Sequence, residues 1–115
     1  MTADQFREIA LSLNGVVEGS HMKHPDFRAN GRIFASLHSG ETTGMVKLTP
    51  DEQAEFMRLK PAMFVPSAGA WGRQGCTNVI LAKADARTLK QAMALALEGV
   101  MARGRGKSSA RVRQR

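Results

Sequence analysis

Residues 24–37 read HPDFRANGRIFASL, and this stretch decides the fold. At its centre, Asn30-Gly31 separates two runs that favour β-strand, and both central residues of a type I′ turn need a positive φ. We therefore predict a β-hairpin with a two-residue loop. That loop length fixes three cross-strand pairs: Ala29 with Arg32, Arg28 with Ile33, and Phe27 with Phe34.

Each strand of this hairpin carries one arginine near the turn. In the predicted register, Arg32 shares a face with Phe27 and Phe34, whereas Arg28 shares the other face with Ile33. The two cations are therefore expected to project from opposite faces of the hairpin tip.

A helix is predicted upstream of the hairpin. Thr2 followed by Gln5 forms a capping box, and apolar residues then recur at helical spacing before Gly15: Phe6, Ile9, Ala10 and Leu13. Residues 16–23 are predicted to form a strand that leads to His24-Pro25 and so to the hairpin.

The downstream half predicts two more strands and two more helices. Residues 44–48 and 76–81 are expected to be strands. Thr49, Pro50 and Glu52 suit the N-cap, first and third positions of a helix that ends before Pro61. Asp85 is expected to cap a last helix that runs to about residue 102. The order of elements predicts an α+β fold, a compact sandwich with helices packed on one face of a mostly antiparallel sheet.

The net charge of +7 is spread unevenly over the 115 residues. Residues 1–102 hold eleven Lys and Arg against ten Asp and Glu, which leaves +1, whereas residues 103–115 hold six Lys and Arg and no acid. We expect residues 1–102 to form one domain. Residues 103–115 are expected to be a basic, disordered tail because they have almost no apolar side chain to bury.

The remaining composition points to a cytoplasmic protein. The last predicted helix contains Lys90 and Glu98, so no membrane span is expected. Residues 1–13 lack a basic leader and a cleavage site, so no secretory signal is expected. Cys76 is the single cysteine, and the lack of an internal disulfide fits a reducing compartment. We take a monomer with no membrane partner as the expected state.

No residues predict catalysis or metal binding. Cys76 has no histidine near it in sequence and is expected to be a buried, inert thiol. His21, His24 and Asp26 are close along the chain but match no zinc-ligand spacing. We therefore expect no enzymatic activity, no metal and no cofactor.

Residues 66–80, PSAGAWGRQGCTNVI, predict a shaped loop ahead of a strand. Its glycines match no phosphate-binding motif, and a phosphate loop should precede a helix. We expect the glycines to let the chain turn around Trp71, whose ring would close one end of the core. Arg73 is then either available to an anion or paired with an acid.

Three segments together resemble the MmcQ/YjbR family of small bacterial proteins: HPDFRANGRIFASL, VKLTPDEQAEF and FVPSAGAWGRQGCTNVIL. They occur in that order, and the resemblance covers nearly all of residues 1–102. It implies a compact α+β sandwich similar to the frataxin-like CyaY architecture and DNA binding through a double wing of β-hairpins. The acidic ridge that iron handling would need is not expected, because the first helix offers only Asp4 and Glu8, with Arg7 between them.

Together these features lead to the hypothesis of a non-enzymatic DNA-binding protein without sequence specificity. The wings would be the Asn30-Gly31 hairpin and the 69–75 loop. The cations expected to contact DNA are Lys23, Arg28, Arg32 and Arg73 in the body and Arg103, Arg105, Lys107, Arg111 and Arg113 in the tail. The alternative hypothesis is a small-ligand or protein-binding adaptor that uses a pocket around Trp71 and Arg73.

Overall fold

The structure is a computed structural model that describes residues 1–38, 40 and 42–104. A six-stranded antiparallel sheet has the order β1-β2-β3-β4-β6-β5, which confirms the predicted α+β class. The strands are β1 (Val17–His21), β2 (His24–Ala29), β3 (Arg32–Leu37), β4 (Thr43–Lys47), β5 (Phe64–Pro66) and β6 (Cys76–Ile80). The helices are α1 (Ala3–Leu11), α2 (Pro50–Leu59), α3 (Gly69–Arg73) and α4 (Ala86–Gly104), with a 3-10 turn η1 (Leu81–Lys83).

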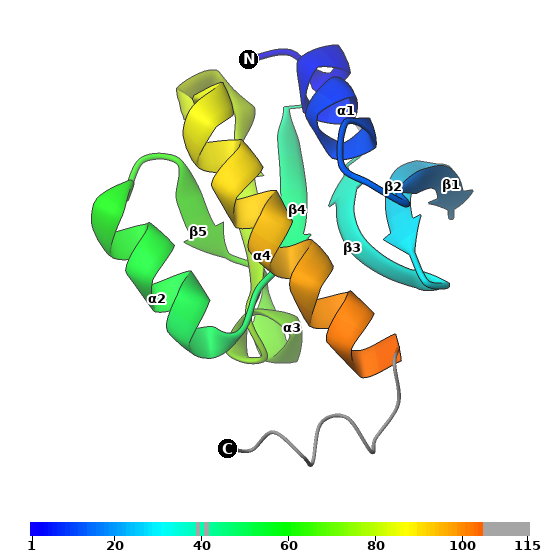
Figure 1. The fold of residues 1–115 in the computed structure, drawn as a ribbon. Coiled ribbons are helices and arrows are strands. Elements are labelled where there is room, and N and C mark those ends of the chain that lie inside the picture. The colour runs from blue at the N-terminus through cyan, green and yellow to red at the C-terminus, as the bar shows by residue number, and fades with distance from the viewer. Residues whose placement is uncertain (39, 41, 105–115) are drawn as a thin grey trace.

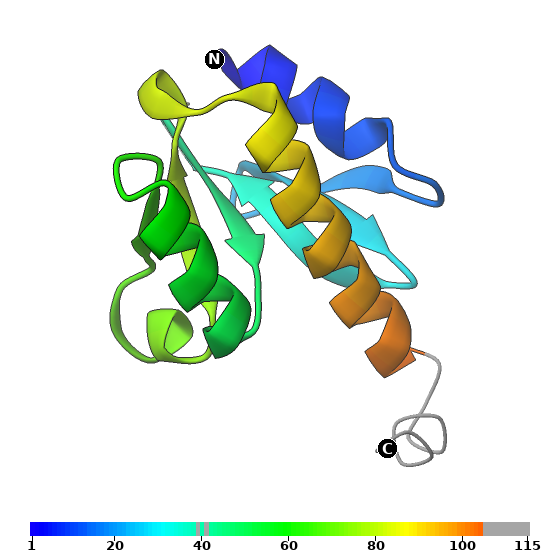
Figure 2. The ribbon, with the colours of Figure 1, turned by 60° about the vertical axis from the view of Figure 1, so that its left-hand side comes forward.

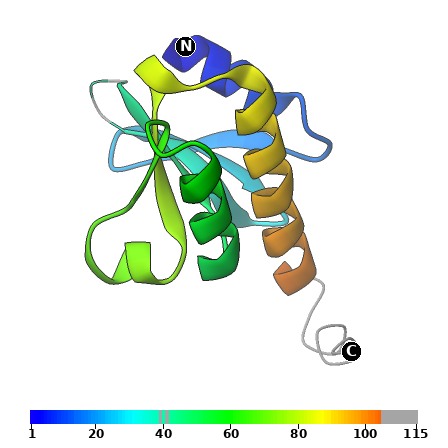
Figure 3. The ribbon, with the colours of Figure 1, turned by 90° about the vertical axis from the view of Figure 1, so that its left-hand side faces the viewer.

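Helices α1, α2 and α4 cover one face of the sheet. Helix α4 crosses β3 and β4, α2 packs on β5 and β6, and α1 lies beside α4 (Figures 1 and 2). Figure 3 shows α2 and α4 side by side on the same side of the sheet, with α3 at the end far from the N-terminus. The core lies between these layers and includes Phe6, Phe27, Phe34, Leu37, Val46, Val79, Leu89 and Met93.

We call the side of the sheet that α1, α2 and α4 do not cover the open face. Along each strand, side chains on the open face alternate with side chains that point toward the helices. The strand pairing assigns to it His21, His24, Asp26, Arg28, Ile33, Ser36, Thr43, Met45, Lys47, Val65, Cys76, Asn78 and Ile80.

The helix starts follow the predicted caps. Capping boxes are present at Thr2 and at Thr49, and the Asp85 carboxylate accepts a hydrogen bond from the backbone N–H of Thr88 at 2.8 Å. Helix α2 ends before Pro61, as predicted, and α4 runs to Gly104, two residues beyond the predicted end. Local hydrogen bonding at the caps therefore sets where the helical layer begins.

The central hairpin is confirmed at its tip and corrected farther from it. Asn30 and Gly31 have φ of 57° and 75°, Ala29 pairs with Arg32, and Arg28 pairs with Ile33. Phe27, however, pairs with Ala35 and not with Phe34, because the register shifts at a β-bulge. The extra residue on β3 lets Phe34 and Ala35 both be buried, and it places Ser36 opposite Asp26.

The 66–75 segment also differs from its prediction. Residues 64–66 form an edge strand that pairs antiparallel with β6, and the expected loop between these two strands contains the short helix α3. Trp71 is 67% exposed, which shows that the prediction of a ring closing the core is wrong. None of the described helices is long and apolar enough to cross a membrane.

Candidate nucleic-acid interface

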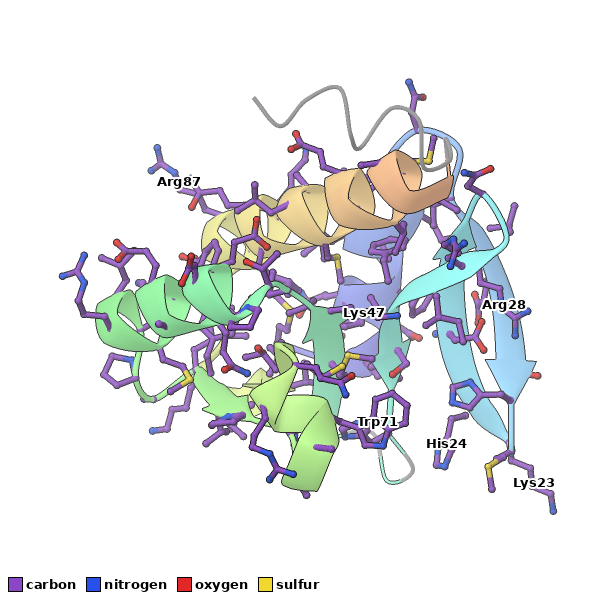
Figure 4. All side chains as sticks on the ribbon, turned by 90° about the horizontal axis from the view of Figure 1, so that it is seen from below. Lys23, His24, Arg28, Lys47, Trp71 and Arg87 are labelled. Atoms are coloured by element: carbon purple, nitrogen blue, oxygen red, sulfur yellow. The ribbon has the colours of Figure 1, made fainter. Side chains whose placement is uncertain are left out.

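The open face combines polar, basic and apolar side chains from the strands of the sheet. Figure 4 shows Lys23, His24 and Trp71 on the side of the sheet turned away from α4, while Arg87 lies beside the helices. Several apolar residues on or next to this face are exposed: Val17 (61%), Met22 (85%), Val65 (41%) and Trp71 (67%). A face that is both apolar and polar and lacks a helical cover is a candidate for binding a partner.

A buried ion pair lies at the β1–β2 edge of this face. Asp26 is fully buried, and its two carboxylate oxygens accept hydrogen bonds from Arg28 Nε at 2.7 Å and from an Arg28 terminal nitrogen at 3.0 Å. His21 Nδ1 donates to the same carboxylate at 2.7 Å. The hydrogen bond from Arg28 is the main cause that lowers the pKa of Asp26, against the opposing effect of burial, with a smaller contribution from His21.

This ion pair changes how Arg28 can act. The guanidinium also donates to the backbone oxygen of Ser20 at 3.4 Å, so it holds β1 and β2 together. Arg28 was predicted as a free cation on the hairpin, and in the structure its charge is matched by Asp26. Its first role is therefore to neutralise a buried carboxylate.

The carboxylates of the described residues are segregated from the open face. Asp26 is the only one assigned to that face, and it is already paired. Glu18 lies on the helix-facing side of β1 and binds Arg7 of α1. The others belong to the helical layer, on α1, α2 and α4 or at the cap of α4: Asp4, Glu8, Asp51, Glu52, Glu55, Asp85 and Glu98.

The predicted body cations do not form one cluster. Lys23 lies in the β1–β2 turn. Arg32 begins β3 at the far end of the β2–β3 hairpin, on the helix-facing side with Ala29. Arg28 is paired with Asp26, and Arg73 is exposed on α3. Arg103 lies in the last turn of α4. The other predicted tail cations are outside the described residues: Arg105, Lys107, Arg111 and Arg113.

Lys47 is an open-face cation that the sequence analysis missed. It is opposite Cys76 across β4 and β6. Within the described chain, no carboxylate forms an ion pair with Lys23, Lys47 or Arg73. Strand alternation was the signal that could have found Lys47: Val46 is apolar and faces the helices, so its neighbour Lys47 must face the other way.

The three histidines gather at one end of the open face. The rings of His21 and His24 have centroids 6.1 Å apart, and His38 Nδ1 is hydrogen-bonded to Thr43 Oγ1 at 2.7 Å. Burial, helped by the nearby His24, lowers the pKa of His38. Over residues 1–38, 40 and 42–104, no three His, Cys, Asp or Glu side chains are placed to share a metal ion.

Cys76 begins β6, on the open face opposite Lys47, and is 6% exposed. Burial raises the pKa of its thiol, and the positive charge of Lys47 acts in the opposite direction. The thiol is thus protonated and shielded, which is the environment of a structural cysteine and not of a nucleophile.

Trp71 lies on the surface of the protein. Its side chain is two-thirds exposed on α3. A pocket of about 400 Å³ that the structure describes lies elsewhere, against the start of α4, and is lined by Met1, Gln5, Glu8, Ile9, Ala84 and Ala86. The feature that supports the alternative hypothesis, a small-ligand or protein-binding adaptor, is therefore an exposed aromatic ring on the surface.

Comparisons with known proteins address both the family and the fold. The family model described as YjbR matches residues 11–96. The crystal structure of Deinococcus radiodurans protein DR2400, described as a DUF419 domain, superposes with a TM-score of 0.75 at 17% identity. The superposition covers 96% of this chain and 86% of that one, and at this identity it shows a shared fold. No curated protein matches the chain.

Proposed function

We propose that this chain, which belongs to the YjbR family, binds nucleic acid, DNA in particular, through the open face of its sheet. The observation that carries the proposal is the charge segregation. The only described carboxylate on the open face is neutralised by Arg28, while Lys23 and Lys47 have no ion-pair partner among the described residues. A phosphate backbone approaching this face meets cations and, among the described residues, no unpaired carboxylate, whereas most of the described carboxylates lie in the helical layer.

The proposed contact is sequence-non-specific and involves no catalytic step. Helices α1, α2 and α4 pack their apolar sides on the sheet, and α3 has only 5 residues, so none of the described helices is positioned like a recognition helix. Lysine and arginine contacts to phosphate fix the position of a nucleic acid without reading its bases. The interface differs from the pair of hairpin wings suggested by the sequence, since it centres on the sheet and on α3.

The test compares two triple variants of the full chain that remove the same charge from different places. One replaces Lys23, Lys47 and Arg73 with Gln, and the matched control replaces Lys83, Arg87 and Lys90 with Gln; all three control residues are exposed on η1 and α4. Binding of a labelled 20-nucleotide single strand and of a 20-base-pair duplex is followed by fluorescence anisotropy at several salt concentrations.

The open-face variant is expected to bind more weakly, and the slope of log affinity against log salt should fall by about 0.7 to 0.9 for each cation that contacts a phosphate. The control variant should retain the parent slope. Equal weakening in the two variants, or no salt-dependent binding of either nucleic acid by the parent chain, would refute an interface on the open face. A third variant with Gln at the tail cations Arg105, Lys107, Arg111 and Arg113 measures the contribution of the tail separately.

A further inference from the structure

The exposure of Trp71 is unusual for its size. Its side chain is 67% exposed, although a tryptophan normally buries most of its large ring. Figure 4 places the ring on the side of the sheet turned away from α4, which is the side of the proposed interface. An exposed large aromatic side chain next to a binding face is characteristic of a contact residue.

The backbone that carries Trp71 is held firmly. Gln53 of α2 donates from its side-chain nitrogen to the backbone oxygens of Gly72 and Cys76, both at 3.0 Å. A Cβ at position 72 would overlap the backbone of Ser67, so only glycine lets the short helix pack this closely. The ring is thus presented by a fixed turn, and its exposure is a consequence of the fold.

Two cations accompany this ring on the proposed interface. Arg73 is exposed two residues along the same helix, and Lys47 lies on the open face with no carboxylate partner among the described residues. A base stacked on an indole ring brings its own phosphates close to the surface, where nearby cations bind them. Bases within a duplex already stack on one another, so an exposed indole is available chiefly to an unpaired base.

We infer that Trp71 is a stacking site for an unpaired nucleobase, and that the interface consequently binds single-stranded nucleic acid more tightly than duplex. This inference rests on the proposed function and adds the class of nucleic acid to it. The ring supplies a flat apolar surface for any base, and the cations of the same interface, Lys47 and Arg73, are the candidates for contacts to the flanking phosphates.

The experiment uses the full chain with a 12-nucleotide oligothymidylate and a 12-base-pair duplex, both labelled, at low salt. Trp71→Ala should weaken binding of the oligothymidylate roughly 5- to 150-fold, which corresponds to the usual value of one base–aromatic stack. Trp71→Phe should retain most of the affinity, and the duplex affinity should change little in either variant. The matched control is Leu59→Ala, which removes another exposed apolar side chain, 54% exposed on α2.

A second measurement follows the fluorescence of Trp71, the single tryptophan of the chain. Oligothymidylate should quench it, whereas heparin, a polyanion without bases, should bind with little quenching. Equal losses for single strand and duplex in Trp71→Ala, or no loss for either, would overturn the stacking site while the salt-dependent binding of the parent chain would still support the proposed function. Quenching by a protein partner but not by oligothymidylate would also overturn it and favour the adaptor.

Discussion

Arg28 and Asp26, two residues apart on β2, form a two-point ion pair in which the carboxylate is fully buried and the guanidinium reaches solvent. Arg28 also donates a hydrogen bond to the backbone oxygen of Ser20, so the same guanidinium contacts the buried carboxylate and the edge strand β1.

Arg28→Ala is expected to destabilise the protein, because Asp26 would keep only His21 as a partner for a buried carboxylate. We expect a fall of the melting temperature by about 5 °C or more, measured by circular dichroism. Arg32→Ala is the matched control: it removes the same charge from the other face of the hairpin, where the side chain is exposed, and should change the melting temperature by less than about 2 °C. Similar melting temperatures for the two variants would show that the ion pair contributes little.

The stability of the protein should depend on pH through Asp26. The folded-state pKa of this carboxyl is lowered, chiefly by Arg28, from an unfolded value of about 3.9. A lowered folded pKa means stability that is fully present above the unfolded pKa and lost as pH falls through the folded pKa. Urea midpoints between pH 7 and pH 2 should therefore fall less steeply in Asp26→Asn than in the parent, although some slope remains because the pKa values of Asp85 and Glu55 are also lowered.

The β1–β2 turn stores backbone strain that substitution should release. Met22 and Lys23 have φ of 50° and 68°, in the left-handed region that side chains such as these rarely adopt. Replacing them with Asn and Gly, the preferred residues of a type I′ turn, should raise stability by roughly 1–2 kcal/mol in urea unfolding. The comparison is Gly31→Ala in the other hairpin turn, where φ is 75° and stability should fall. An unchanged midpoint in the Asn-Gly variant would mean that the turn carries no strain.

Cys76 should react slowly with thiol reagents in the folded protein. The thiol is buried, and burial raises its pKa, so little thiolate is present at pH 8. Ellman's reagent is expected to label one thiol per chain in 6 M urea and much less than that in buffer over the same time. Rapid labelling in buffer would indicate that β6 opens readily or that the thiol is accessible.

The elements that local chemistry determines could be predicted from the sequence. The capping residues Thr2, Thr49 and Asp85 and the Asn30-Gly31 turn act within four residues of themselves, and each is found where it was expected. The bulge at Phe34 could not be found in the same way, because it depends on how two strands and the helix above them share space. The same is true of the turn that follows α3, where Gly75 lies against the carbonyl of Leu48, a residue far along the chain.

The candidate site was harder to predict than the fold. Counting cations identified Arg28, but the sequence does not show that Asp26, two positions earlier, takes up its charge. Among the described residues, the open face has no unpaired carboxylate. This pattern depends on which face of its strand each side chain occupies, and the sequence alone does not give that assignment. Trp71 is the single tryptophan of the sequence, and we predicted that its ring closes the core because a ring of that size is usually buried. In the structure the ring is exposed.

The two edge strands of the sheet, β1 and β5, differ in length and in proline content. On one side β5 has three residues and finishes at Pro66, which has no N–H to donate to an incoming strand. On the other side β1 has five residues and no proline. A peptide or another copy of the chain that adds a strand to the sheet is thus expected to pair with β1, beside the strained turn. Ser20→Pro would prevent that pairing.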